Sequence, residues 1–510
     1  MLSIVNSCAV FGMDAFAVKV EVDVSNGMPG FDIVGLPDAA VRESRERVKT
    51  AIKNSGYEFP LKRITVNLAP ADLKKEGATF DVPIAVGILS ATGQLAENKL
   101  LSEAMFVGEL SLDGTIHGVK GVLPMAAAMA DYGLQTFVVP TANAKEAALT
   151  DSGDVYGVEN IGSLVNWWNG QTELQPTKVN IAEIFAYDNA EHKIDMADVK
   201  GQDAVKRAME IAAAGGHNLL MVGSPGSGKT MLARRMVTIL PPMTLQESLE
   251  TTRIYSVAGE LPVGTALVTA RPFRAPHHTS SAASVIGGGR IPRPGEVSLA
   301  NHGILFMDEM PEFPRDVLEA LRQPLEDKVV TISRVNGKMI YDASFQLVGA
   351  MNPCPCGYLG DPYHVCGCTP NQIERYTAKI SGPLLDRIDM VVNVQRVKYE
   401  EIHNQKTGES SEVIRGRVIA ARNIQETRFG RQGVFCNANL TRQQMLECCR
   451  LTDSAEALMK EAFKKFHLSA RSYDKILKVS RTIADLAKSD LIDMAHIAEA
   501  LQYRAMHEER

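Results

Sequence analysis

The sequence predicts a multidomain α/β protein, and three observations lead to this class. The chain has 510 residues, enough for about two to four domains with cores of their own. Strand-like and helix-like segments alternate in its N-terminal part, and a strand, a glycine-rich loop and a helix follow one another near the middle. Long helical patterns fill the C-terminal part.

The composition and charge of the chain limit the partners and the cellular compartment that we expect for it. The formal net charge is −6 with 22% charged residues, so any nucleic-acid contact must come from a local basic surface. Residues 1–8 lack the basic segment of a signal peptide, and the apolar stretch 121–130 is too short to span a bilayer. We therefore expect a cytoplasmic protein without membrane attachment. The eight cysteines do not suggest a disulfide framework in such a chain.

The chain divides into three zones. Residues 1–170 alternate strands and helices, and a polar stretch with glycine and proline predicts a linker over 171–190. Residues 191–395 carry the glycine-rich loop, and residues 396–510 show helical periodicity. The expected elements include strands at 16–22 and 63–68 and helices at 38–55, 472–488 and 493–506.

The glycine-rich loop is a complete GxxxxGK[ST] motif. It consists of Gly223, Ser224, Pro225, Gly226, Ser227, Gly228, Lys229 and Thr230. An apolar run at 219–222 precedes it and a helical pattern at 231–237 follows it, which disfavours a chance glycine-rich turn. Backbone N–H groups of such a loop hold phosphates, while Lys229 reaches the β and γ oxygens and Thr230 binds Mg²⁺. The motif predicts binding of a nucleoside triphosphate.

A second apolar strand, at 303–307, ends in Asp308 and Glu309. The carboxyl end of a strand is where ligands of open α/β sheets lie. We expect Asp308 to hold Mg²⁺ and Glu309 to activate the attacking water as general base. The alternative is that both acids only cap the next element.

Three further polar residues fit this machinery. Asn352 ends the strand at 346–351 and is placed to orient water against the γ-phosphate. Arg387 could act as an arginine finger toward a neighbouring subunit, or it could form a surface ion pair with Asp386 or Asp389. Arg471 opens a C-terminal helix and could sense the nucleotide or only face solvent.

These motifs, in this order and approximate spacing, resemble AAA+ ATPases. The stretches 271–281 and 384–389 resemble the magnesium-chelatase branch, and the whole chain is similar to the ComM/YifB group of magnesium-chelatase-like proteins. The resemblance implies a hexameric ring with a helix-2 insert, a pre-sensor-1 hairpin and a C-terminal helical lid. It also implies that Asn352 is sensor 1, Arg387 the finger and Arg471 sensor 2. ComM-type members are described as DNA branch-migration helicases in natural transformation.

Two basic segments are candidates for DNA contact. Residues 271–293 surround a glycine hinge at 287–289 and predict a mobile basic loop, and residues 329–341 alternate on both sides of Asn336–Gly337, which predicts a hairpin. Their cations predict salt-dependent, sequence-independent contacts to single-stranded or branched DNA, although both segments could also be solvated surface excursions. The candidate residues are Arg271, Arg274, Arg290, Arg293, Arg334 and Lys338.

A cysteine cluster lies in the loop 352–370, with the spacing C-x-C-x₉-C-x-C. Its members are Cys354, Cys356, Cys366 and Cys368. Four thiolates could close a structural Zn²⁺ site that folds this loop, and His364 could replace one ligand. Redox-active thiols and cysteines with no joint role are the alternatives.

The N-terminal zone resembles the α+β domain of Lon proteases, with a ribosomal-S5-like fold, through the stretch 108–121. Lys120 matches the lysine of the Lon Ser–Lys dyad, but the region that should supply the serine offers only Thr79. We therefore expect a scaffold or a DNA-facing platform, with Lys74, Lys75 and Lys120 as possible phosphate contacts.

The sequence as a whole favours an ATP-dependent, hexameric DNA motor for homologous recombination of incoming DNA. Each active site would combine Lys229, Thr230, Asp308 and Glu309 of one subunit with Arg387 of the next. The main rival is a chelatase-type motor that acts with partner subunits. An ATP-dependent peptidase and a non-enzymatic nucleotide-binding scaffold are weaker rivals.

Overall fold

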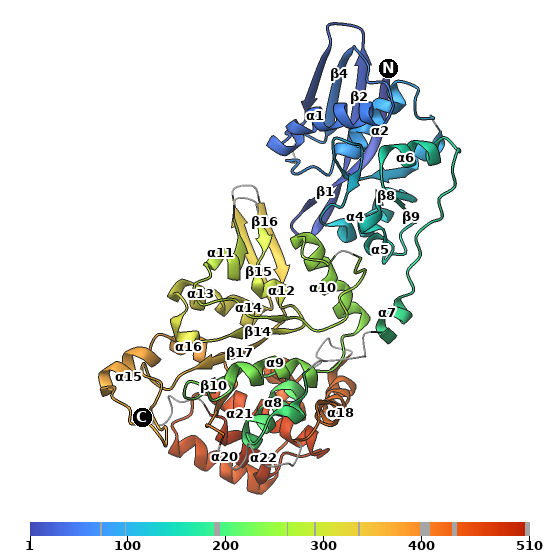
Figure 1. The fold of residues 1–510 in the computed structure, drawn as a ribbon. Helices are drawn as coiled ribbons and strands as arrows, with labels where there is room; N and C mark the ends of the chain where they lie inside the picture. The colour runs from blue at the N-terminus through green and yellow to red at the C-terminus, as the bar shows by residue number, and fades with distance from the viewer. Residues whose placement is uncertain are drawn as a thin grey trace. The chain divides into compact units, whose positions relative to one another are not determined.

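The computed structural model describes residues 1–71, 74–96, 98–187, 194–262, 264–289, 292–334, 337–397, 408–430 and 436–504. These residues form two compact units, drawn in Figure 1. The first unit contains Met1–Asn189, Leu245–Thr269 and Ser333–Ile340. The second contains Ala190–Thr244, Ala270–Ile332 and Tyr341–Arg510. Each is a mixture of helices and strands, so the predicted α/β class is confirmed.

The first unit is built on a seven-stranded mixed sheet with the order β3-β4-β2-β1-β5-β8-β9. Its pairs β1–β2 and β2–β4 are antiparallel, and its other neighbouring pairs are parallel. In β4 the buried residues Ile64, Val66 and Leu68 alternate with more exposed ones, as the period of a strand requires. The strands are β1 Leu2–Phe11, β2 Asp14–Ser25, β3 Gly30–Val34, β4 Arg63–Ala69, β5 Ala104–Phe106, β8 Thr136–Pro140 and β9 Asp154–Val158.

The helices of the first unit begin and end where the sequence offers caps. Helix α1 starts after Asp38, whose carboxylate accepts the Val41 N–H at 2.8 Å, and it ends at Asn54, as predicted. A short antiparallel pair, β6 Glu109–Leu110 and β7 Ile116–His117, completes the unit's strands in the described residues. The helices are α1 Ala39–Asn54, α2 Asp81–Ala91, α3 Lys99–Glu103, α4 Val122–Ala128, α5 Ala144–Ala147, α6 Ile161–Trp168, α7 Ile181–Tyr187 and α10 Leu245–Ala258.

A buried carboxylate ties α1 to α2. Asp81, at the start of α2, is fully buried and accepts hydrogen bonds from Arg47 Nε at 2.7 Å and from the Ser44 hydroxyl and the Leu110 N–H. A buried charge persists in a core only when it is paired and hydrogen-bonded, as this one is. Arg47 is therefore part of the interior of the first unit, although its position on α1 suggests a solvated face.

Helix α10 packs on the first unit although the chain enters and leaves it from the second. It contacts α4, and the Ser256 hydroxyl donates to the buried Glu146 carboxylate at 2.5 Å. The same carboxylate accepts the Leu123 N–H at 3.0 Å. The sequence prediction placed residues 245–269 inside the zone 191–395, because nothing in their periodicity indicates which unit they contact.

The second unit is built on a five-stranded sheet with the order β11-β14-β17-β10-β18, in which every neighbouring pair is parallel. Strands β10, β14 and β17 are buried along their whole length, as expected for a parallel sheet covered on both faces. The strands are β10 Leu219–Val222, β11 Phe273–Arg274, β14 Ile304–Met307, β17 Gln346–Met351 and β18 Met390–Asn393.

Helices α8 Asp203–Gly215 and α9 Lys229–Ile239 pack beside this sheet, and the C-terminal helices pack on them. Apolar residues of α8, α9 and the C-terminal helices share one core with the strands. The helices expected at 472–488 and 493–506 are present as α21 and α22. The C-terminal helices are α18 Ser411–Phe429, α19 Arg442–Cys448, α20 Asp453–Lys465, α21 Ala470–Leu486 and α22 Met494–Gln502.

Smaller elements connect the strands of the second sheet. The predicted hairpin is present as β15 Val329–Arg334 paired with β16 Gly337–Asp342. The segment expected to be a mobile basic loop begins as strand β11 of the main sheet, and its β12 Gly287–Gly288 pairs with β13 Arg293–Pro294. Short helices complete this region: α11 Ala282–Val285, α12 Glu296–Leu299, α13 Arg315–Ala320, α14 Arg322–Asp327, α15 Pro370–Thr377 and α16 Gly382–Leu385.

Across the described part of the chain, no helix combines the length and the apolar character needed to cross a bilayer.

Candidate functional site

The GxxxxGK[ST] loop joins β10 to α9 in the second unit, as its sequence context predicts. Gly226 and Gly228 have φ values of +78° and +92°, a conformation that glycine adopts without strain. A Cβ on Gly223 would lie 2.3 Å from the Val394 carbonyl oxygen, so β18 approaches the loop too closely for any side chain there. The loop therefore turns tightly between two strands and presents the N-terminus of α9, the arrangement that binds phosphates.

Lys229 lies in the first turn of α9 and points back over the loop. Its ammonium donates to the Gly223 carbonyl at 2.7 Å, to the Ser224 carbonyl at 3.1 Å and to Asn352 Oδ1 at 3.2 Å. Partial burial lowers the pKa of Lys229, while the Asp308 and Glu309 carboxylates act in the opposite direction. The structure thus brings Lys229 and Asn352 together across 123 residues of sequence.

Thr230 and Asp308 meet at the edge where β14 ends. The Thr230 hydroxyl donates to Asp308 Oδ2 at 2.6 Å, and the Glu309 N–H donates to Asp308 Oδ1 at 2.9 Å. A hydroxyl and a carboxylate side by side are a donor set that suits Mg²⁺. The short helical turn Met310–Glu312 that follows has Glu309 at its N-cap position, and its side chain makes no capping hydrogen bond.

Glu309 has an unusual backbone and a neighbour that the sequence prediction missed. Its φ is +49°, in the left-handed region that non-glycine residues rarely adopt and that is enriched at functional sites. Its carboxylate is about half exposed and lies 3.4 Å from His278 Nδ1. The motif 271–281 was visible in the sequence, but its pairing with Glu309 depends on the parallel contact of β11 with β14.

Arg387 and Arg471 each form an ion pair within the second unit. The Arg387 guanidinium contacts Glu326 of α14 and donates to the Pro383 carbonyl at 2.6 Å. Arg471 lies 3.4 Å from Asp386, and both of these side chains are exposed. Arg387 therefore pairs with a residue that is distant in sequence, rather than with either of its neighbouring aspartates.

The candidate DNA-contacting residues are in different environments. Arg271 donates to the carbonyls of Pro241 and His302, each at 2.6 Å, and Arg274 forms a two-bond ion pair with Glu296 at 2.6 and 2.9 Å. These contacts hold both guanidiniums within the second unit.

The structure describes the side chains of two of the other four candidates. Arg293 and Lys338 are exposed. Arg290 and the side chain of Arg334 lie outside the described residues.

The four cysteines of the loop 352–370 gather as predicted. The Cys354 Sγ atom lies 3.4 Å from that of Cys356 and 3.6 Å from that of Cys366, and all four sulfur atoms lie within 4.8 Å of one another. A tetrahedral Zn²⁺ with bonds of about 2.3 Å requires sulfur separations of about 3.8 Å. The cluster is therefore compatible with a Zn²⁺ site, and the ring of His364 instead lies 3.3 Å from Asp361.

The thiols of the cluster share hydrogen bonds, which shift their pKa values in opposite directions. A backbone hydrogen bond from Tyr358, with help from the neighbouring thiols, lowers the pKa of Cys356, whereas hydrogen bonds from the other thiols raise the pKa of Cys366 and Cys368.

The predicted dyad lysine of the first unit has a different partner. The Lys120 ammonium lies 3.5 Å from the Ala258 carbonyl at the C-terminus of α10, where a cation compensates the helix dipole. Lys75 is fully buried and donates to the Pro70 carbonyl, so it is not a surface contact for DNA. Thr79 is partly buried and its carbonyl accepts the Gly108 N–H at 3.0 Å.

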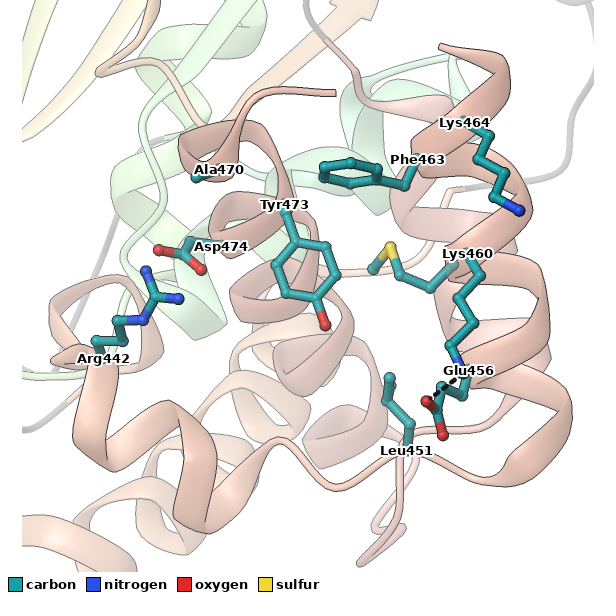
Figure 2. Close-up of a pocket in the computed structure, with 10 residues that line it drawn as sticks. Arg442, Leu451, Glu456, Lys460, Phe463, Lys464, Ala470, Tyr473 and Asp474 are labelled. Carbon is teal, nitrogen blue, oxygen red and sulfur yellow. Dashed lines mark ion pairs between the residues drawn. The ribbon is translucent and has the colours of Figure 1, made fainter. Parts of the chain in front are cut away.

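A cavity of about 390 Å³ opens among the C-terminal helices α19, α20 and α21, as Figure 2 shows. The rings of Phe463 and Tyr473 meet edge to face at 6.2 Å beside it, and Lys460 pairs with Glu456 at 2.7 Å on its rim. No residue of the phosphate loop lines it. The full lining is Arg442, Leu451, Glu456, Met459, Lys460, Phe463, Lys464, Ala470, Tyr473 and Asp474.

The fold and the site define a P-loop protein of the AAA+ type, with the phosphate loop, Asp308–Glu309 and Asn352 at the ends of neighbouring parallel strands. Three family models match the chain. They are subunit ChlI of Mg-chelatase over residues 20–143, magnesium chelatase subunit ChlI over 195–402, and the magnesium chelatase subunit ChlI C-terminal region over 408–504.

Similar proteins extend this match to the whole chain. Competence protein ComM of Haemophilus influenzae is 45% identical over 507 residues, which cover 99% of this chain and 98% of that protein. The uncharacterized protein YifB of Escherichia coli is 42% identical over 506 residues, 99% of this chain and 97% of that protein. An archaeal Lon protease of Halobacterium salinarum is 31% identical over 119 residues, 20% of this chain and 15% of that protein. The chain belongs to the ComM/YifB group of the magnesium-chelatase family.

Proteins of this family are AAA+ ATPases, which use ATP and Mg²⁺. The residues present fit both, because the loop offers N–H groups and Lys229 to phosphates, and Thr230 and Asp308 offer oxygen to the metal.

Proposed function

We propose that this protein is an ATP-driven motor that moves on DNA, with helicase or branch-migration activity in homologous recombination. The observation that carries the proposal is the assembled nucleotide site, in which Lys229 touches Asn352 and Thr230 touches Asp308. The similarity to a competence protein over the whole chain supports a role with incoming DNA. A DNA substrate is also the reason to place the protein in the cytoplasm.

In this proposal the phosphate loop and Lys229 bind the triphosphate and neutralise its β and γ oxygens. Thr230 and Asp308 would hold Mg²⁺, which would supply charge stabilisation to the transferring phosphoryl group. Glu309 accepts a proton from the attacking water, and its exposed carboxylate leaves room for that water beside it. Asn352 orients the water or the γ-phosphate, and its contact with Lys229 keeps the amide at the edge of the loop.

The proposed assembly is a homo-hexamer with active sites between subunits. Arg387 would reach the nucleotide of a neighbouring subunit as the finger, and Arg471 would act as sensor 2 from the helical lid. Their partners Glu326 and Asp386 hold the two guanidiniums in place within the protomer. A subunit interface that presents a phosphate would compete with these exposed carboxylates for the guanidiniums.

DNA contacts in this proposal rest on the exposed cations Arg293 and Lys338, together with Arg290 and Arg334. Arg271 and Arg274 support the site in another way, because their bonds fix the strand that leads to His278. The hairpin β15–β16 would carry Lys338 toward DNA as the pre-sensor-1 hairpin. Contacts of this kind bind phosphates without reading sequence.

We further propose that the cysteine cluster holds structural Zn²⁺ and that the first unit is a Lon-like scaffold without peptidase activity. The partial match to an archaeal Lon protease supports the Lon-like fold. The contact of Lys120 with the end of α10 supports a structural role for this lysine in place of a base. A peptidase would need a hydroxyl beside it, and no serine stands at the dyad position.

The test is ATP hydrolysis by the purified protein with no DNA, with single-stranded DNA and with branched DNA, at about 50 and 200 mM salt. We expect DNA to stimulate turnover strongly at the lower salt concentration and weakly at the higher one. Lys229→Ala should abolish turnover in every condition, and Lys338→Ala should reduce the stimulation and its salt dependence. A branch-migration assay with a four-way junction then measures the motor activity directly.

A chelatase-type motor is the second candidate, favoured by the match of three magnesium-chelatase family models. Such a motor acts on partner subunits and has no reason to respond to DNA. Turnover that depends on Lys229 but is indifferent to both DNA structures would exclude the DNA motor and favour this candidate.

A further inference from the structure

The cysteine loop lies directly against the phosphate loop. Gly357, between the two cysteine pairs, has a φ of +84°, and a Cβ at this position would lie 2.6 Å from Pro225 Cδ. Pro225 is the third residue of the GxxxxGK[ST] motif. The backbone of one loop therefore lies close against a side chain of the other.

Asp361 links the cysteine loop to Arg396 through charge. Its side chain is fully buried, and Oδ1 accepts the N–H groups of Tyr363 at 2.9 Å and His364 at 3.0 Å. On its other side the carboxylate lies 3.2 Å from Arg396 Nε. The carboxylate thus holds its own loop and pairs with Arg396 at once.

Arg396 closes this connection. It follows β18 and donates from Nη2 to the Pro225 carbonyl at 3.2 Å, while its guanidinium lies 5.9 Å from the centre of the Tyr358 ring. Asp361, Arg396, Gly357 and the phosphate-loop residue Pro225 form what we name the brace.

The cysteine loop cannot hold its side of the brace by apolar packing. Among the apolar residues of 353–369 only Cys354 and Gly357 are buried, and Tyr363 and Val365 are 66% and 96% exposed. A loop without a core depends on cross-links for its conformation, and the four sulfur atoms are the groups placed to provide one. The conformation of the brace should therefore depend on what the cysteines bind.

We infer that metal bound by the four cysteines controls the affinity of the phosphate loop for nucleotide, and that Asp361 and Arg396 are the positioning residues that transmit this control. The inference rests on the proposed zinc and nucleotide sites and adds their coupling. A metal-bound loop holds Pro225 in the binding conformation before the nucleotide arrives. Without metal, nucleotide binding must also order both loops, and the affinity falls by the cost of that ordering.

The first experiment separates the brace from the metal. Asp361→Asn keeps the size of the side chain but removes the charge that attracts Arg396. We expect it to retain zinc, measured by elemental analysis, and to bind a fluorescent ATP analogue about tenfold more weakly than the wild type. KM for ATP should rise with kcat little changed, a split that general destabilisation would not produce. Val365→Ala, in the same loop, is the matched control and should leave zinc content and nucleotide affinity unchanged.

The second experiment removes the metal. Cys366→Ser, and wild type treated with a zinc-selective chelator in excess Mg²⁺, should both lose zinc and weaken binding of the analogue to a similar extent. Zn²⁺ added back should restore affinity in the treated wild type. The double variant Asp361→Asn/Cys366→Ser should bind the analogue with about the affinity of the weaker single variant. The two effects should not add, because both substitutions break the same connection.

Two results would overturn the inference. One is nucleotide affinity at the wild-type level in Asp361→Asn, and the other is unchanged affinity in the wild type after zinc removal. Both measurements are made without DNA, so an absence of DNA stimulation contradicts the proposed function and leaves the coupling standing. Loss of analogue binding in Lys229→Ala verifies that the affinity measured is that of the phosphate loop.

Discussion

Lys229 and Glu309 have different contacts in the nucleotide site, and these contacts suit different roles. Lys229 is held by loop carbonyls and Asn352, so it is placed for binding. Glu309 has a left-handed backbone, and its half-exposed carboxylate pairs with His278 while its N–H donates to Asp308 Oδ1. Binding and proton transfer should therefore be separable by mutation.

Glu309→Gln tests this separation. We expect the rate of ATP hydrolysis to fall by about 100-fold or more, since a general base is lost. Affinity for the ATP analogue should stay close to that of the wild type, because the amide keeps the size of the side chain. Single-turnover hydrolysis and equilibrium binding measure the two quantities. Glu312→Gln, which changes an exposed acid of the same segment that pairs with Lys379, is the control. Hydrolysis at the wild-type rate in Glu309→Gln would exclude Glu309 as the base.

The contact between the second sheet and helix α21 of the second unit includes a titratable histidine. His217 precedes β10 and is fully buried, and its Nε2 lies 2.8 Å from the Thr482 hydroxyl of α21. Burial lowers the pKa of His217 to about 4. The contact between the sheet and the C-terminal helices therefore requires a neutral imidazole.

The stability of the second unit should consequently fall in mild acid. Below an unfolded pKa of about 6.5 the unfolded chain binds a proton at His217 that the folded chain excludes down to about pH 4, so stability is lost as the pH falls through this window. The full loss is about 3 kcal/mol. The measurement is thermal unfolding at pH 4 to 7, following the transition that Mg²⁺ and the ATP analogue shift. His217→Gln cannot titrate and should flatten the dependence, whereas an equal slope in this variant would contradict the assignment.

The proposed role of Arg387 as an arginine finger depends on how whole molecules assemble. Within the protomer Arg387 pairs with Glu326, and the proposed hexamer would bring it to a second phosphate loop. The proposed role involves two neighbouring subunits, so its test requires assembled protein.

Mixing two inactive variants tests it. Arg387→Ala should lower hydrolysis by about 1000-fold, the usual effect of losing an arginine finger, and Lys229→Ala should abolish it. When the two are mixed, a Lys229→Ala subunit can offer Arg387 to an intact phosphate loop on its neighbour, and part of the activity should return. Glu326→Gln, which releases the guanidinium, should remain active. Mixed assemblies that form but stay inactive would place Arg387 at its own nucleotide.

The nucleotide residues could be predicted from sequence because each stands in a local pattern. The phosphate loop needs glycines at Gly226 and Gly228 for its turn, a strand before it and a helix after it, and all of these are contiguous. Asp308 and Asn352 each follow an apolar strand directly. The cysteine spacing likewise predicted the cluster, because the four cysteines lie within one short loop.

Residues that act through distant partners could not be predicted in this way. Arg274 is a candidate for DNA contact in the sequence, yet it binds the Glu296 carboxylate of another element, and Arg47 likewise binds Asp81. Position on a helix or in a basic segment sets where a cation lies but not which acid approaches it.

The sequence by itself therefore determined the fold class, the phosphate loop and the two acids that end the second strand, because these depend on short contiguous patterns. Only the tertiary structure decided that α10 packs on the first unit, that His278 stands beside Glu309, and that Asp361 of the cysteine loop pairs with Arg396, which contacts the phosphate loop. The physical reason is the range of the interactions. Backbone geometry and periodicity act over a few residues, whereas ion pairs and packing join segments that only the completed fold brings together.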